Sequence, residues 1–115
     1  MRRCNILGLG LIGGSLASAL TAQGWRVSGS DARVESEGEA IALGLIHEIG
    51  IDSDAEISFV CTPVGSIVDQ VRLALRATKG IVTDVGGVKA PAVAAIDDPR
   101  FVGGHPMAGS ELIGL

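Results

Sequence analysis

The feature that most constrains the fold of this chain is a glycine-rich turn, GLGLIGG, at residues 8–14. The apolar residues before it, 4–7, predict a strand, and residues 11–22 carry apolar side chains at intervals of four, which is the spacing of a helix. A glycine turn that joins a strand directly to a helix is typical of α/β domains, in which the backbone passes close to a ligand or a neighbouring element. The first two elements therefore predict an α/β domain.

The rest of the chain continues this alternation of strand and helix. Helical patterns that end at glycines alternate with short runs rich in Ile, Val and Leu. We expect further strands at residues 25–30, 45–49, 57–61, 81–85 and 101–102, and helices at residues 35–43, 66–77 and 89–96. Together with the first strand they fit a Rossmann-type, doubly wound, mainly parallel six-stranded sheet in the order 3-2-1-4-5-6.

Composition is consistent with one domain of this class. The 115 residues are 47% hydrophobic but only 3% aromatic, so the core must be aliphatic, as in parallel strands covered by helices. We expect a single dinucleotide-binding domain over residues 1–115. The net charge of −4 and the lack of any Lys/Arg run beyond Arg2 and Arg3 argue against nucleic acid and anionic membranes as partners. No apolar stretch has the length of a membrane span.

The two cysteines and one of the two histidines carry no functional pattern. Cys4 and Cys61 lie in strand-like contexts without metal-ligand spacing, so we expect reduced, buried thiols and no metal. No secretion signal precedes them, which favours a cytoplasmic protein. His47 lies near the predicted edge of the sheet, and we expect it to be exposed and without a role.

The glycine turn has the pattern G-x-G-x-x-G at Gly8, Gly10 and Gly13. In a dinucleotide site the first glycine allows the tight turn, the second lets the pyrophosphate approach, and the third lets helix and strand pack closely. The following helix directs the free N–H groups of its first turn, here from Leu11 and Ile12, at the phosphates. The alternative is a structural turn with no ligand.

Asp31 ends the second predicted strand, 18 residues after Gly13, where an acid can bind the adenosine ribose hydroxyls and repel a 2′-phosphate. This position favours NAD over NADP as the cofactor. Arg33 acts against that preference, because a nearby arginine can accept a 2′-phosphate. The alternative for Asp31 is a helix N-cap or a turn residue.

Three later strand ends carry unusual sequences: CTPVGS at residues 61–66, TDVGGVK at 83–89 and GGHPMAGSE at 103–111. In a parallel sheet these ends meet at one edge, where ribose and nicotinamide would lie, and His105 would lie near the site of hydride transfer. The cofactor contacts expected from these ends are Cys61, Thr62, Pro63, Asp84 and Gly86.

In these segments the sequence resembles the N-terminal domain of prephenate/arogenate dehydrogenases. The matching segments are GLGLIGGSLA, CTPV, TDVG-VK and GGHPMAGSE, in that order, and the resemblance covers essentially the whole chain. It implies NAD-dependent oxidative decarboxylation of prephenate or arogenate in tyrosine biosynthesis. Hydride passes to NAD while CO2 leaves and the ring becomes aromatic. Full-length relatives are expected to be homodimers.

The resemblance also implies roles for three residues of the late loops. His105 would accept the proton of the substrate hydroxyl, which a neutral imidazole can do near neutral pH. The alternative is a loop histidine that bonds to backbone or contacts substrate without proton transfer. Gly87, His105 and Ser110 are the expected substrate contacts.

Two departures from the family pattern affect this interpretation. Relatives usually have Ser at the position of Gly87, where a hydroxyl can orient the imidazole, and its loss predicts a rate lower by about 10-fold or more. Relatives also continue into a helical dimerisation domain, so we expect a polypeptide truncated before that domain to bind NAD weakly and to be inactive alone. The alternatives are a non-catalytic NAD(P)-binding module or degenerate paralogue, and a related dehydrogenase of another small acid.

Overall fold

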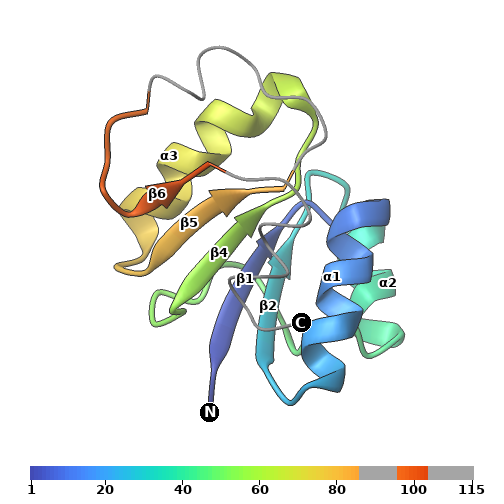
Figure 1. The fold of residues 1–115 in the computed structure, drawn as a ribbon. Helices are drawn as coiled ribbons and strands as arrows, with labels where there is room; N and C mark the ends of the chain where they lie inside the picture. Colours follow the sequence, from blue (N-terminus) through green and yellow to red (C-terminus); the bar gives the residue numbers. More distant parts are fainter. Residues whose placement is uncertain (86–95, 104–115) are drawn as a thin grey trace.

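The computed structural model describes residues 1–85 and 96–103, and these form one six-stranded sheet with helices on both faces (Figure 1). The strand order is β3-β2-β1-β4-β5-β6 and every pair is parallel, as predicted. In chain order the elements are β1 (Arg3–Leu7), α1 (Leu11–Ala22), β2 (Arg26–Ser30), α2 (Val34–Ala42), β3 (Glu48–Ile49), β4 (Ile57–Val60), the 3₁₀ turn η1 (Val64–Ser66), α3 (Ile67–Ala77), β5 (Ile81–Asp84) and β6 (Phe101–Val102).

The bounds of the helices and strands agree with the predicted ranges to within two residues, with the exception of β3 and of the predicted helix at 89–96. β3 comprises only Glu48–Ile49, because the backbone N–H of Leu45 still bonds to the carbonyl of Ala40 at the end of α2, and Ile46 is buried in the core. The first two residues of the predicted strand, Leu45 and Ile46, therefore pack as apolar side chains and do not pair with β2. The predicted helix at 89–96 lies outside the described residues except for Ile96, which is not helical.

Two apolar clusters hold the sheet between its helices. Alternate residues of each strand face opposite sides, so Ile6, Val27 and Phe59 pack with α1 and α2 on one face. Leu7 and Val60 pack with α3 on the other. Of the described aromatic side chains, Phe59 and Trp25 are buried and Phe101 packs at the margin of the second cluster, so the core is mainly aliphatic, as its composition predicted.

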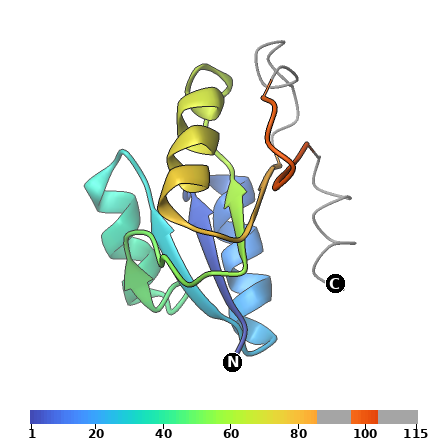
Figure 2. The ribbon, with the colours of Figure 1, turned by 90° about the vertical axis from the view of Figure 1, so that its left-hand side faces the viewer.

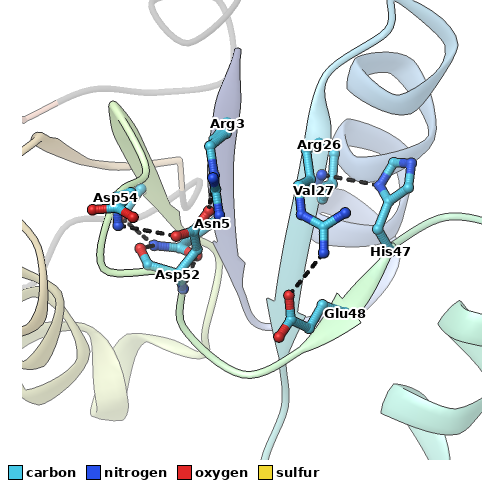
Figure 3. A network of polar contacts seen from close by, with 9 residues as sticks. Arg3, Asn5, Arg26, Val27, His47, Glu48, Asp52 and Asp54 are labelled. Carbon is cyan, nitrogen blue, oxygen red and sulfur yellow. Dashed lines mark hydrogen bonds and ion pairs between the residues drawn. The ribbon is translucent and has the colours of Figure 1, made fainter. Parts of the chain in front are cut away.

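The connection from β3 to β4, residues 50–56, contains no helix and lies on the sheet through polar contacts (Figure 3). The amide side chain of Asn5, which is fully buried, donates to the carbonyl of Asp52 (3.0 Å) and accepts from its backbone N–H (2.8 Å). Arg3 donates to the Asp52 carboxylate at 2.6 Å. The side chain of Asn5 thus pairs with this connection as a neighbouring strand would.

β6 is attached to the sheet and also to the end of α3. The guanidinium group of Arg100 donates to the carbonyl oxygens of Thr78 (2.7 Å) and Leu75 (2.6 Å), which lie in the last turn of α3 and just beyond it. A cation at this position satisfies carbonyls that have no partner within the helix and complements the helix dipole. Figures 1 and 2 show the segment that contains β6, in orange-red, next to β5.

Within the described ranges, no helix has the length and apolar character needed to cross a membrane.

Candidate functional site

A groove of about 940 Å³ opens at the carboxyl ends of β1, β2 and β4. The chain moves outward from β1 through β2 to β3 and then returns to β4 on the other side of β1, so the loops after β1 and β4 diverge. Such a switch point is where doubly wound sheets bind ligands. The groove is lined by Gly8, Gly10, Leu11, Ile12, Ser30, Asp31, Ala32, Arg33, Ser36, Cys61, Thr62, Pro63, Ser66, Ile67, Gln70 and Val85.

The three glycines of the turn have different structural roles. Gly8 has φ +99° and its N–H bonds to the carbonyl of Ser30 at 2.8 Å, and a Cβ there would lie 2.7 Å from the carbonyl carbon of Cys61. A Cβ on Gly13 would overlap the carbonyl oxygen of Gly8. By contrast, a Cβ on Gly10 would meet nothing within 4 Å. Gly8 and Gly13 are therefore required by the fold, whereas Gly10 leaves space in the groove.

The N-terminus of α1 opens into this groove. Gly10 is the N-cap, no side chain caps the helix, and its first turn contains no acidic residue. Leu11 and Ile12, the first two residues of the helix, are 88% and 43% exposed, and both line the groove. The first amides of a helix have no partner within it and carry the positive end of its dipole, so this end can bind an anion such as a pyrophosphate.

Asp31 connects the two turns on the β2 side of the groove. Its Oδ2 accepts the backbone N–H of Leu9 at 2.6 Å, and its Oδ1 accepts the N–H of Arg33 at 2.9 Å. Its own N–H donates to Oε2 of Glu37 at 3.1 Å. The N-cap of α2 is Arg33, so Asp31 is a turn residue and not the helix cap.

The opposite wall comes from the end of β4 and the start of α3. The backbone N–H of Cys61 bonds to the carbonyl of Leu7 at 2.7 Å, which keeps this loop beside the glycine turn. Burial raises the pKa of the Cys61 thiol to about 12, so near neutral pH the thiol is an uncharged side chain of the wall. The hydroxyl of Thr62 is buried, and among the described residues it has no hydrogen-bond partner.

Most of the site residues predicted from the sequence lie together in this groove. Nine of them line it: Gly8, Gly10, Leu11, Ile12, Asp31, Arg33, Cys61, Thr62 and Pro63. Gly13 lies behind the turn, and Asp84 is fully buried at the end of β5. The predicted residues Gly86, Gly87, His105 and Ser110 lie outside the described ranges, so their roles remain predictions.

Sequence reasoning missed the polar side chains that surround the predicted ones. Ser66 and Gln70 line the groove from η1 and α3, and their spacing of four could have indicated one helix face directed at the end of β4. Glu37 contacts the backbone of Asp31 although it lies on the next helix. His47 is exposed, as expected, but its Nδ1 accepts the N–H of Val27 at 3.1 Å, so it has a structural role at β2 (Figure 3).

The described part of the chain contains both cysteines. Cys4 is buried and Cys61 is half-buried, and both are free thiols. No group of His, Cys, Asp or Glu side chains within residues 1–85 and 96–103 has the arrangement of a metal site.

Comparison with known proteins extends these findings to a family. The family model described as "Prephenate dehydrogenase, nucleotide-binding domain" matches residues 16–115. The prephenate dehydrogenase of Bacillus subtilis is 37% identical over 127 residues, covering 96% of this chain and 34% of that protein. The prephenate dehydrogenase of Lactococcus lactis is 30% identical, covering 100% of this chain and 36% of its own length.

Solved structures resemble this fold closely. Prephenate dehydrogenase from Aquifex aeolicus, in complex with hydroxyphenyl propionate and NAD+, has a TM-score of 0.80 and 31% identity, covering 95% of this chain and 43% of that one. Arogenate dehydrogenase from Synechocystis has a TM-score of 0.75 and 33% identity, covering 90% of this chain and 40% of that one. A 3-hydroxyisobutyrate dehydrogenase from Mycobacterium tuberculosis, at 19% identity, shares the fold alone.

The chain spans about a third of the length of the curated relatives that it matches. The family model begins within α1 and runs to residue 115, so it includes Asp31, the loop from Cys61 to Pro63 and the late loops, and the two curated relatives align with nearly the whole chain. The resemblance carried by the four sequence segments is therefore confirmed, and the chain belongs to the prephenate dehydrogenase family through its nucleotide-binding domain.

Proposed function

We propose that this chain is the cofactor domain of an NAD-dependent enzyme that oxidatively decarboxylates prephenate or arogenate in tyrosine biosynthesis. The observation that carries the proposal is the groove at the switch point, where the open Gly10 and the uncapped end of α1 face the carboxylate of Asp31. A pyrophosphate would lie beside Gly10 and the N-terminus of α1, and an adenosine ribose would lie beside Asp31.

The residues of the groove fit this dinucleotide. The space beside Gly10 allows a phosphate to approach the backbone, and the amides of Leu11 and Ile12 supply donors. Asp31 would accept the hydroxyls of the adenosine ribose, while the loop from Cys61 to Pro63 would lie along the other side of the dinucleotide. When bound, the nicotinamide accepts a hydride from the carbon that bears the substrate hydroxyl.

The remaining part of the reaction is assigned to the late loops. His105 would take the hydroxyl proton as hydride leaves the same carbon, and the ring would lose CO2 and become aromatic. Gly87 and Ser110 are the other proposed substrate contacts. Support comes from the sequence GGHPMAGSE and from the family match, which includes these loops.

NAD is the proposed cofactor in preference to NADP, and two carboxylates support it. Asp31 lines the groove and would repel a 2′-phosphate there, and Glu37 accepts the backbone N–H of Asp31. Arg33 also lines the groove and is the one cationic side chain that the described residues contribute to it. A neighbour whose structure contains NAD+ has the same fold at 31% identity.

A second candidate is a non-catalytic NAD-binding module. Gly87 favours it, because the hydroxyl that relatives carry at this position is absent. The homodimeric state and the cytoplasmic location expected for family members remain predictions, as does the inactivity of the 115-residue polypeptide alone.

Calorimetric titration with NAD and NADP, followed by an assay of NADH formation with prephenate and with arogenate, tests the proposal. We expect binding of NAD that is tighter than binding of NADP. A chain that binds neither nucleotide would refute both candidates. Binding without turnover, in a polypeptide that contains the complete substrate site, would favour the non-catalytic module. Turnover that His105→Ala abolishes would support the enzyme.

A further inference from the structure

We propose that Asp31 has a second role in addition to binding ribose: it is a positioning residue that holds the phosphate turn in the shape that receives a dinucleotide. This inference rests on the proposed function, since the turn is assigned to the pyrophosphate there. It predicts that loss of Asp31 lowers the affinity of the chain even for nucleotides that have no ribose hydroxyls.

The contacts of the carboxylate carry the proposal. Leu9 lies between the first two glycines of the turn, and its N–H donates to Oδ2 of Asp31 at 2.6 Å. A hydrogen bond from an amide to an ionised carboxylate at this distance belongs to the stronger class. The two residues come from different turns, one after β1 and one after β2, so this bond joins the turns directly.

Asp31 is itself held in place, so that it can act as an anchor. The N–H of Arg33 donates to its other oxygen at 2.9 Å, and Oε2 of Glu37 accepts its backbone N–H at 3.1 Å. The residue before it, Ser30 at the end of β2, also contacts the turn, because its carbonyl accepts the N–H of Gly8 at 2.8 Å. Two adjacent hydrogen bonds, Gly8 to Ser30 and Leu9 to Asp31, therefore hold the start of the turn against β2.

The two roles of Asp31 are compatible. An ionised carboxylate has about four acceptor positions on its two oxygens. The backbone amides of Leu9 and Arg33 occupy two, and Asp31 lines the groove, so positions remain for the ribose hydroxyls. The bond from the Leu9 amide is not required of a carboxylate whose single role is to bind ribose.

Charge makes the two roles separable by the sign of an effect. A carboxylate near a phosphate repels it, so removing the charge of Asp31 without any change of the turn would leave the affinity for a phosphate ligand unchanged or raise it. If Asp31 positions the turn, the same removal releases the Leu9 amide and lowers that affinity.

The experiment compares ADP with 2′,3′-dideoxy-ADP, which has the pyrophosphate but no ribose hydroxyls, on the wild-type chain and on Asp31→Ala. We expect the affinity of Asp31→Ala for dideoxy-ADP to fall about tenfold or more, the effect of one hydrogen bond to a charged group. Glu35→Ala is the matched control, since it removes an exposed acid from the first turn of α2 and should leave this affinity unchanged or raise it. Unchanged or tighter binding of dideoxy-ADP by Asp31→Ala would overturn the proposal.

A measurement without ligand separates this inference from the proposed function. In the free wild-type chain, the Leu9 amide should exchange slowly with solvent by NMR, and Asp31→Asn, which loses the charge, should speed its exchange. Fast exchange of the wild-type Leu9 amide would refute the positioning role whether or not nucleotides bind. Failure of the wild-type chain to bind ADP or NAD would instead refute the proposed function, and the Leu9 amide would still decide the inference.

Discussion

The carbonyl oxygen of Gly8 occupies the space that a side chain on Gly13 would need. This contact brings the first turn of α1 against the end of β1, and Gly13 is buried there. Close packing of helix against strand directs the N-terminus of α1 at the groove. The third glycine of the motif is thus required by the fold, whereas the second, Gly10, leaves space in the groove.

Replacing Gly13 by Ala should destabilise the folded chain. Its methyl group would overlap backbone that has no room to move, because Gly8 is itself fixed against Cys61, and we expect a loss of about 3 kcal/mol in the free energy of unfolding by urea denaturation. Gly14→Ala is the control within the same helix, since its Cβ would lie 3.8 Å from the carbonyl oxygen of Leu9. That variant should gain about 0.5–1 kcal/mol from helix propensity. Equal stability of the two variants would contradict the assigned role.

Replacing Gly10 by Ala should separate ligand binding from stability. The new methyl group meets nothing within 4 Å in the protein, and the φ of −72° at this residue suits Ala. We expect the free energy of unfolding to change by less than about 0.5 kcal/mol. The methyl group would, however, occupy the approach of the pyrophosphate, so NAD affinity measured by calorimetry should fall about tenfold or more. Unaltered NAD affinity would show that the phosphates bind elsewhere.

Glu37→Gln should relax the preference for NAD. The amide oxygen of Gln can still accept the N–H of Asp31, so the turn is kept while one negative charge beside Asp31 is lost. At low ionic strength we expect NADP affinity to rise about three- to tenfold with NAD affinity nearly unchanged. Glu39→Gln, an exposed acid further along α2, is the control and should change neither. Parallel changes in both affinities would argue against a role in selectivity.

Asn5→Ala should lower the free energy of unfolding and leave the groove unchanged. The side chain of Asn5 pairs with the N–H and carbonyl of Asp52 and also donates to the hydroxyl of Ser58 at 3.1 Å, so its removal leaves buried polar groups without partners. We expect a loss of about 2–4 kcal/mol in urea denaturation.

The control for Asn5 lies in the same network. Asp54→Ala removes an exposed carboxylate but keeps the backbone N–H that donates to Asp52 at 2.9 Å, and its effect should stay below about 0.5 kcal/mol. A loss from Asn5→Ala no larger than this would mean that the side chain of Asn5 does not hold residues 50–56 on the sheet.

Alkaline pH should destabilise the fold through its two thiols. Burial, with a smaller contribution from Glu56 and Asp52, raises the pKa of Cys4 to about 12, and burial raises that of Cys61 to about 12. An unfolded thiol ionises near its ordinary pKa of about 9, so above that pH the unfolded chain binds fewer protons than the folded chain. Stability should therefore fall between about pH 9 and 12, by up to about 1.4 kcal/mol per pH unit for each thiol.

The contribution of the thiols to the pH dependence of the unfolding free energy can be measured with a Cys variant. The chain has no Tyr, so no phenol ionises in the same range. Cys61→Ala should reduce the slope of unfolding free energy against pH above about pH 9, whatever its effect at neutral pH. An unchanged slope in this variant would show that the Cys61 thiol is not shielded in the folded state.

Local patterns in the sequence were enough to predict the order of elements, the strand order of the sheet and most of the groove. α1 has the predicted bounds of 11–22, because its apolar spacing and the glycines on both sides define it within one segment. Gly8, Gly10 and Gly13 were assigned to the turn for the same reason. β3 was predicted too long, because apolar residues after α2 read alike whether they pair in a strand or pack into the core.

The tertiary structure alone decided the contacts between residues that are distant in sequence. No local pattern relates Leu9 to Asp31, or Asn5 to Asp52, yet these bonds attach the phosphate turn to β2 and the β3–β4 connection to the sheet. Hydrophobic periodicity specifies which face of an element is buried, since that depends on residues a few positions apart. Which polar atoms then meet depends on how strands register and how turns close, and this is fixed only when the whole sheet has formed.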